Sequence, residues 1–401
     1  MTNITINGAL TAALQGETSL EVEFFVEVWQ SQVKVAEVEV LSGSISQSYN
    51  VSTRRTCDLE LAGWSYLGGG EGIIPEIVYS GTDTKYGDDT YGEGIYGDAA
   101  FAYYRSLLAP LISQARVYGI YRYPGGSDTI KLGTFTLGDP TFSDTPAGVT
   151  ISVSGWSGEY DISRNLFEAP VAFAAGTPVD EAMHFLVDPR VVQGSSVTFP
   201  DTNETTSKQS YLPGEGVSAW AVARELAATV GWVVYVDRDG NVVGEPTYSA
   251  SEYPEPSWSL SDTGTLLELT LSPWSSDFCN RMVVSAENSD QSPVFAVATD
   301  VTGPYGTTAL GMAIAKEYRS DKPSNLAQAQ NLANTMLRKY GRMSETVSGT
   351  CLPIPHLEVG STVLVTSTGL QLDDPVYVLE RITTPLDPTE PTTFEAVRRI
   401  G

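Results

Sequence analysis

The stretch SLEVEFFVEVWQ, residues 19–30, alternates apolar and polar side chains over most of its length. A period of two is typical of a β-strand that has one face on a core and the other in water. The stretches VKVAEVEVLSGSIS (33–46) and RTCDLELAG (55–63) repeat the alternation. Residues 19–62 are therefore predicted to form strands of a sheet that has one buried face and one solvent-exposed face.

Strand patterns continue after these stretches. ARVYGIYRYPGGSDTIKLGTFTLGDP (115–140) predicts a hairpin that turns at PGGSD, and GVTISVSGWSGEY (148–160) predicts a further strand. A Gly- and Tyr-rich segment, 64–104, interrupts the series. Residues 1–165 are therefore expected to form a β-barrel or sandwich with one long insertion.

The pattern then changes to helices. TPVDEAMHFLVDP (177–189) and SAWAVARELAATVG (218–231) have helical character, and the first residue of each, a Thr and a Ser, is the predicted N-cap. WVVYVDRDGNVVGEP (232–246) predicts a hairpin with Asp-Gly at its turn. Residues 166–255 are therefore expected to form a small α/β domain.

A second β region begins near residue 264 with TLLELTLS and NRMVVSAEN, and four strand-like stretches follow toward the C-terminus. Between them, NLAQAQNLANTMLRKYG (325–341) predicts a helix, since it is rich in Ala and ends in Arg, Lys and Gly. Residues 256–401 are therefore expected to form a second β domain that contains one helix. The predicted fold class is mainly β with an α/β insertion.

The chain is strongly acidic, with 49 Asp and Glu against 23 Lys and Arg and a net charge of −26. Proteins that bind nucleic acid through its phosphates need clustered basic residues, so this class is excluded. The charge suits a surface that DNA passes without sticking. No window approaches the roughly 18 apolar residues of a membrane span, and the N-terminus lacks the basic region of a signal peptide. The sequence therefore predicts a soluble protein.

The sequence carries no pattern of catalytic or metal-binding residues. Cys57, Cys279 and Cys351 lie far apart, so they are predicted to be buried thiols of a protein made in a reducing cytoplasm. The only histidines, His184 and His356, have no nucleophile motif around them and are expected to pack or to hydrogen-bond. We expect no enzymatic activity, no cofactor and no metal.

Acidic pairs are common in such a chain and give weak evidence for acid–base chemistry. Glu159 and Asp161, like Asp373 and Asp374, are expected to lie in solvated turns. The run DRDGN (237–241) begins like a calcium loop but lacks the later ligands, so a hairpin turn is predicted.

The run KYGDDTYGEGIYGD (85–98) repeats Tyr-Gly with a step of five, which fits neither a helix nor a strand. Three interpretations stay open: a loop whose tyrosines dock on a partner protein, a solvated or partly disordered loop, and a cation or sugar site. The candidate contact residues are Tyr86, Tyr91, Tyr96, Asp88, Asp89 and Glu93.

Arg54 and Arg55 enter a predicted strand, where neighbouring side chains point to opposite faces. In so acidic a chain, an inward arginine needs a carboxylate partner. We interpret the two as a candidate ion-pair anchor at a subunit boundary, with an ordinary exposed pair as the alternative.

The order of these patterns resembles the tail hub proteins (baseplate hub or tail-tip hub) of long-tailed bacteriophages. The similarity spans about residues 20–401 and rests on the fixed order of individually weak motifs. Those motifs include LSGSISQSYNVSTRRTCDLELAG (41–63), LLAPLISQARVYGIYRY (107–123), GVTISVSGWSGEYDISRNLF (148–167) and SNLAQAQNLANTMLRKYG (324–341). The Tyr-Gly insertion departs from the family pattern.

The resemblance implies a homotrimer in which each chain contributes two tail-tube-like β-barrel domains, so that six barrels match a hexameric tail tube. The ring would be assembled in the host bacterial cytoplasm and would lie at the tail tip of the virion. Its implied partners are the tail tube or distal tail protein, the tape-measure protein, and receptor-binding or fibre proteins. Double-stranded DNA would pass through without specific binding, since a trimer carries 3 × −26 = −78 charges.

Two other functions stay open. An acidic β protein rich in Tyr and Trp is also compatible with a carbohydrate-binding or polysaccharide-degrading protein of a phage tail. The equivalent hub of a phage-derived injection device has the same sequence features.

Overall fold

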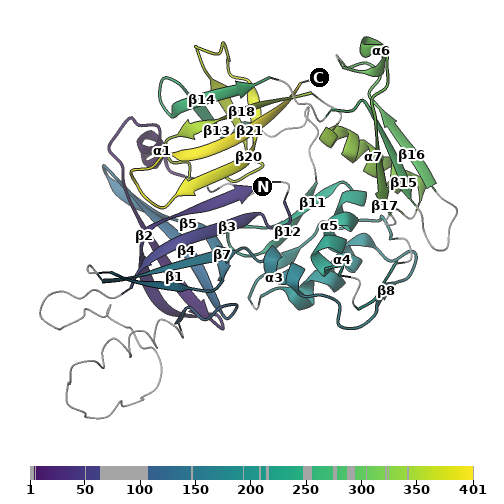
Figure 1. Ribbon diagram of the computed structural model, residues 1–401. Helices are drawn as coiled ribbons and strands as arrows, with labels where there is room; N and C mark the ends of the chain where they lie inside the picture. Colours follow the sequence, from purple (N-terminus) through teal and green to yellow (C-terminus); the bar gives the residue numbers. More distant parts are fainter. Residues whose placement is uncertain are drawn as a thin grey trace, which may run out of the picture.

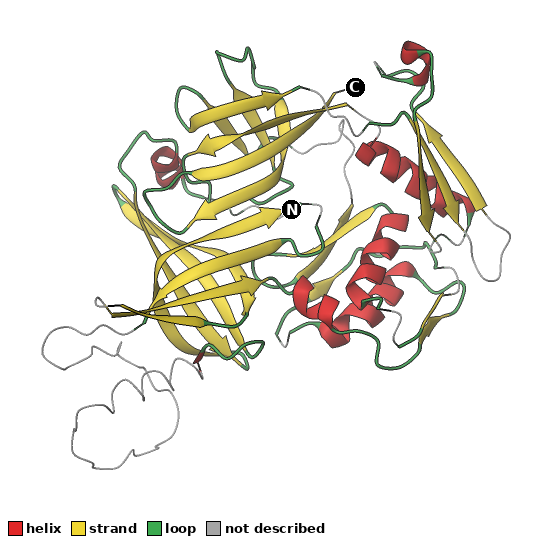
Figure 2. Ribbon diagram, in the orientation of Figure 1, coloured by secondary structure: helices red, strands yellow, loops and turns green. Residues whose placement is uncertain are grey.

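The computed structural model shows strands in two sheet-built units on one side and helices with smaller sheets on the other (Figures 1 and 2). The structure describes residues 4, 6–49, 51–63, 107–145, 148–192, 194–206, 209–213, 216–246, 255–273, 278–286, 294–303, 305–320, 323, 325–340 and 343–400.

Six strands of the first β unit form a closed circuit in the order β1-β4-β5-β7-β3-β2, because β2 also pairs with β1. The alternation of the sequence sets which side chains are buried: Phe24, Val26 and Val28 of β1 face the core, and the residues between them face outward. The strands are β1 (Glu21–Gln30), β2 (Val33–Ser48), β3 (Arg55–Ala62), β4 (Ser113–Tyr123), β5 (Gly126–Leu137), β6 (Thr141–Thr145), which pairs with β7, and β7 (Gly148–Trp156).

A second β unit follows the order β13-β19-β20-β21-β18-β14. The end of β2 pairs with β20 from Ser44↔Pro385 to Ser48↔Arg381, so the two units share one 13-stranded sheet. The strands are β13 (Trp258–Ser261), β14 (Leu266–Ser272), β18 (Met343–Cys351), β19 (Thr362–Thr366), β20 (Val376–Pro385) and β21 (Thr392–Ile400).

A helical unit with its own core lies between the two in sequence. Ser218 caps α5 as predicted, accepting a hydrogen bond from the Ala221 amide. The predicted Thr cap at 177 is wrong, since α4 begins after Pro178 and the Thr177 hydroxyl donates to Ala174 O instead. The elements are α3 (Glu159–Arg164), β8 (Val171–Phe173), α4 (Val179–Val187), η1 (Asp188–Arg190), β9 (Val197–Thr198), β10 (Gln209–Tyr211), α5 (Ala219–Thr229), β11 (Trp232–Val236) and β12 (Val242–Pro246).

The predicted helix near 325–341 is present as α7, but it does not pack in the second β unit. It covers one face of a separate three-stranded sheet, β16-β15-β17, and shares a third core cluster with it. The elements are β15 (Arg281–Ala286), β16 (Val294–Thr299), α6 (Thr307–Leu310), β17 (Ala315–Ser320) and α7 (Leu326–Tyr340). The domain boundaries at 165 and 255 stay a prediction.

A short helix, α1 (Gly8–Leu14), was not predicted. Asn7 caps it by accepting a hydrogen bond from the Leu10 amide, and Leu10 and Leu14 are buried in the core cluster of the two β units. The Asn7 side-chain amide also donates to the Tyr123 hydroxyl of β4 and to Asp128 of β5. The helix is thereby tied to the first β unit.

Candidate functional site

The arginine pair singled out in the sequence lies in a buried junction between three units of the fold. Arg55 Nη2 is 2.6 Å from Glu358 Oε2, and Arg54 Nη2 is 3.8 Å from the same oxygen. Glu358 lies in the segment between β18 and β19 of the second β unit. Arg54 and Arg55 are only 3% and 1% exposed, so the alternative of an ordinary exposed pair is wrong. The partner carboxylate belongs to the same chain; a location at a subunit boundary stays a prediction.

A third arginine reaches the same carboxylate from the helical unit. The β11–β12 turn carries Arg238, whose Nε donates to Glu358 Oε1 at 2.6 Å and whose Nη1 donates to Pro355 O at 3.1 Å. The turn itself is held by Asp237, which accepts from the Asp239 and Asn241 amides, so the predicted hairpin is confirmed. A single carboxylate therefore connects the first β unit, the second β unit and the helical unit.

The charges of the arginines decide the ionisation of Glu358. Burial alone would raise the pKa of this carboxyl group, but the neighbouring charges of Arg55, Arg238 and Arg54 outweigh burial and lower the pKa to about 2. Burial and the charge of Arg55 lower the pKa of Arg54, whose guanidinium also stacks 3.8 Å from the centre of the Tyr235 ring. Three arginines around one carboxylate thus keep it ionised.

A second buried carboxylate, Glu159, accepts hydrogen bonds from two residues at the edge of the junction. Glu159 Oε1 accepts from the Val236 amide at 2.9 Å, and Oε2 accepts from the Ser157 hydroxyl. The Ser157 oxygen in turn accepts from the Arg55 amide at 3.1 Å. Burial raises the pKa of Glu159. The expectation of a solvated turn is wrong for Glu159, because β7 ends at Trp156 and α3 turns this side chain inward.

The two histidines have structural surroundings. His184 Nδ1 lies 3.0 Å from Asp188 Oδ1, one helical turn away. His356 packs edge-to-face on Trp258 with ring centres 4.6 Å apart. Burial, and then the charge of Arg238, lower the pKa of His356 to about 4, so its ring is neutral near pH 7. The prediction of packing or hydrogen bonding is confirmed for both residues.

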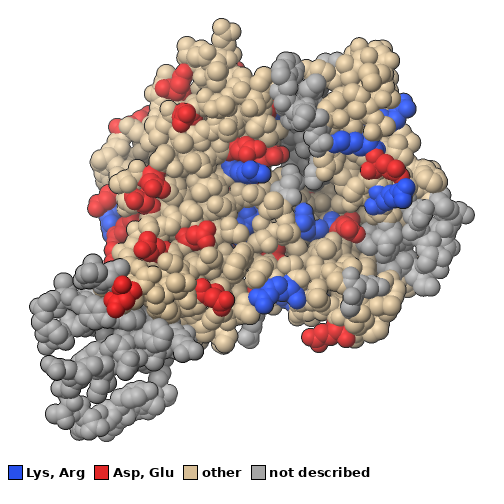
Figure 3. Space-filling view, in the orientation of Figure 1, with Lys and Arg blue, Asp and Glu red and all other residues tan. Residues whose placement is uncertain are grey.

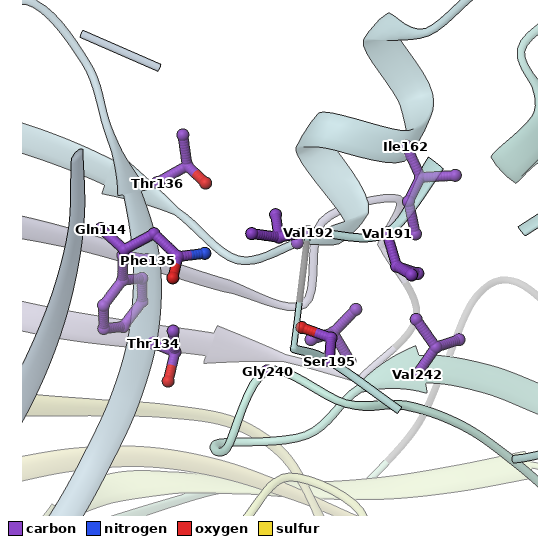
Figure 4. A pocket seen from close by; sticks show the side chains of 12 residues that line it. Gln114, Thr134, Phe135, Thr136, Ile162, Val191, Val192, Ser195, Gly240 and Val242 are labelled. Carbon is purple, nitrogen blue, oxygen red and sulfur yellow. The ribbon is translucent and has the colours of Figure 1, made fainter. Parts of the chain in front are cut away.

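Two pockets lie next to the junction. The residues that line the pocket in Figure 4 include Thr134 and Thr136 of β5, Ile162 of α3, and Val236 and Val242 of the β11–β12 hairpin. Its volume of about 20 Å³ has room for one water molecule. A larger pocket of about 450 Å³ lies between the N-terminal segment that includes α1 and the segment of β13, and His356 also lines it.

The remaining sequence predictions concern the Tyr-Gly repeat, the cysteines, metal binding and membrane helices. The candidate contact residues Tyr86, Tyr91, Tyr96, Asp88, Asp89 and Glu93 lie outside the described residues. Cys57, Cys279 and Cys351 are buried thiols, as predicted. Within the described ranges, no group of three or more His, Cys, Asp or Glu side chains could hold a metal ion. No helix in the same part of the chain is long and apolar enough to cross a membrane.

Glu358 and Arg238 were not predicted as site residues from the sequence. The signal for Glu358 was a lone carboxylate in the apolar run LPIPHLEVG, and the signal for Arg238 was a cation inside a hairpin turn. Neither signal names its partner, because the pairing joins segments that only the fold brings together.

Charge is distributed unevenly over the surface. In the view of Figure 3, red side chains gather over the first β unit on the left, whereas most blue side chains lie from the centre to the right. The outer faces of β1 and β2 carry Glu21, Glu23, Glu27, Glu37 and Glu39. Lys34 pairs with Glu27 and Glu37 at 2.7 Å each, and Arg122 pairs with Glu23 at 2.6 Å.

Solved structures share this arrangement over nearly the whole chain. A tail protein from Neisseria meningitidis MC58 superimposes with a TM-score of 0.59 at 14% identity, covering 94% of this chain and 96% of that one. The 43 kDa tail protein of prophage MuSo2 from Shewanella oneidensis gives 0.56 at 14% identity, with 94% and 98% covered. A prophage tail protein from Listeria monocytogenes gives 0.53 at 10% identity, with 94% of each chain covered.

No protein-family model and no curated protein sequence matches the chain. At 10–14% identity the similarity establishes the fold. The chain therefore has the mainly β fold of phage tail proteins, which confirms the fold that the resemblance implied.

Proposed function

We propose that this chain is a structural tail hub protein, forming a trimeric, pseudo-sixfold ring at the tail tip of a virion. The ring joins the hexameric tail tube to the host-recognition apparatus and surrounds the channel for DNA ejection. The observation that carries the proposal is the pair of β units joined by the β2–β20 ladder in one chain. Three such chains supply six β units, which matches a sixfold tube. The three tail proteins with this fold support the same setting.

The ring explains the chain's composition. A trimer carries 3 × −26 = −78 charges, and an acidic channel repels phosphates so that a duplex slides without binding. The partners on this proposal are the tail tube or distal tail protein, the tape-measure protein, and receptor-binding or fibre proteins. The function is assembly, and the buried junction serves to hold the two β units at one fixed angle.

Light scattering of the purified chain at two salt concentrations tests the proposal. The expected mass is close to three times 43.1 kDa. A monomer at both salt concentrations would contradict spontaneous ring formation. Turnover or retention of host cell wall or capsule by such a monomer would favour the carbohydrate-binding or polysaccharide-degrading alternative.

The Tyr-Gly repeat is proposed to contact a neighbouring tail protein. Deletion of residues 83–98 should then prevent complete tail assembly or infection while leaving the purified chain folded by circular dichroism. Fully formed, infectious tails carrying the deletion would contradict this role.

A further inference from the structure

Among the described residues, the sheet β16-β15-β17 has a helix, α7, on one face only. Inward residues such as Met282, Val284 and Ala298 pack on α7. On the opposite face, Phe295 is 62% exposed and Val297 is 48% exposed, and no described residue covers them. An exposed apolar strip on an edge strand is typical of an interaction surface. We call this surface the uncovered face.

The part of the chain that contains the uncovered face carries a net positive charge. Residues 278–342 contain seven Lys and Arg against five Asp and Glu, a net charge of 7 − 5 = +2 in a chain of −26. Arg281, Glu317 and Arg319 lie on this face, because their strand neighbours point toward α7, and Arg319 Nε is 3.1 Å from Glu317 Oε1. The Arg319 side chain is 82% exposed. Two arginines against one glutamate leave this face with a net positive charge, so its apolar strip fits an acidic partner surface with apolar residues of its own.

The outer face of β1 and β2 has that complementary character. Five glutamates and one lysine lie on these two strands, and Glu39 is exposed next to Leu41, which is 46% exposed. Val38 and Val40, on either side of Glu39, are buried, whereas Glu39 and Leu41 are both exposed, so Glu39 and Leu41 share the outer face. We call this surface the acidic face.

The two faces lie on opposite sides of the molecule: β1 and β2 are at the lower left of Figure 1, and β15, β16 and β17 are at the right. One copy cannot satisfy both faces by itself. A contact between two different patches on successive copies is head-to-tail and closes into a ring when the rotation allows it.

We propose that the uncovered face of one copy docks on the acidic face of a second copy of this chain. The inference rests on the ring of the proposed function and names the contact that builds it. Phe295 and Val297 supply the apolar centre against Leu41, and Arg281 and Arg319 approach the glutamates of β2. Burial of the apolar centre gives the affinity, and the charges set partner choice and register.

Disulfide trapping between two single-cysteine surface variants tests the contact. Val297→Cys and Leu41→Cys are purified separately, mixed and treated with a mild oxidant; the native cysteines are buried and give little background. A mixed dimer is expected only when both variants are present. Phe185→Cys, which lies on α4 and is as exposed as Phe295, replaces Val297→Cys as the matched control and should give no mixed product.

Charge exchange gives an independent readout. Glu39→Lys and Arg319→Glu should each reduce the fraction of trimer in light scattering. The double variant that carries both substitutions has opposite charges across the contact again, so its fraction of trimer should recover. A trimeric mass without the mixed disulfide overturns the docking and leaves the ring standing. A disulfide formed by Val297→Cys alone indicates a twofold contact and also overturns it. A monomer without any mixed product overturns both the docking and spontaneous ring formation.

Discussion

The first β unit completes its own circuit of hydrogen bonds, whereas the second leaves β13 and β14 at the two ends of its strand order. The first unit closes through the ladder from Phe25↔Glu39 to Gln30↔Val33. Among the described residues no ladder joins β13 to β14. A closed circuit has no free edges, whereas an open one depends on what lies beside it. The second unit therefore depends more on its neighbours, which are the β2–β20 ladder and the arginine junction.

The largest expected effect is the loss of the junction carboxylate. Glu358→Gln keeps the shape of the side chain but leaves Arg54, Arg55 and Arg238 buried without their counter-charge. Removal of one partner of a buried pair costs about 3–5 kcal/mol of the free energy of unfolding. Urea denaturation followed by tryptophan fluorescence measures the loss.

The matched control is Glu390→Gln, an exposed carboxylate in the β20–β21 turn, which should change the free energy of unfolding by no more than about 0.5 kcal/mol. Equal effects of the two variants would show that the junction does not stabilise the second unit.

The same carboxylate predicts a specific acid sensitivity. The pKa of Glu358 is lowered to about 2 in the folded protein from an ordinary value of 4.5. Its contribution is therefore fully present above pH 4.5 and is lost as the pH falls from 4.5 toward 2, by about 3 kcal/mol in all. Wild type should lose stability over this window more steeply than Glu358→Gln. Parallel pH profiles of the two proteins would contradict the assignment.

Asn7 tests the link between α1 and the first β unit. Asn7→Ala removes the N-cap of α1 and the hydrogen bonds to Tyr123 and Asp128, at a cost of about 1–2 kcal/mol in thermal or urea unfolding. Asn7→Ser keeps a capping oxygen but lacks the amide donor. If Asn7→Ser loses less stability than Asn7→Ala, the difference is the contribution of the N-cap. If the two variants lose the same amount, the whole effect comes from the hydrogen bonds to Tyr123 and Asp128.

The strands of both β units could be predicted from the sequence, whereas the contacts that join the units could not. Strands of both units were found because the alternation of core and solvent residues is local. The division of 256–401 was harder, because the stretches of β16 and β17 lack a clear signal beside the strong helix α7. The β2–β20 ladder and the contact of Glu358 with three arginines join residues far apart in the chain, and a local pattern carries no information about such a partner. Arg54 and Arg55 could be singled out, but their carboxylate could not.

The smallest expected effect concerns the closing ladder itself. Lys34 bridges Glu27 of β1 and Glu37 of β2 across the closure, and its side chain is partly exposed. Surface ion pairs contribute about 0–1 kcal/mol, so Lys34→Met should change the free energy of unfolding by less than about 1 kcal/mol. The backbone hydrogen bonds between β1 and β2 remain in this variant, and they are the interactions that close the unit. A loss of the size expected for Glu358→Gln would show that the first unit, too, depends on a charge contact, and would remove the contrast between the two units.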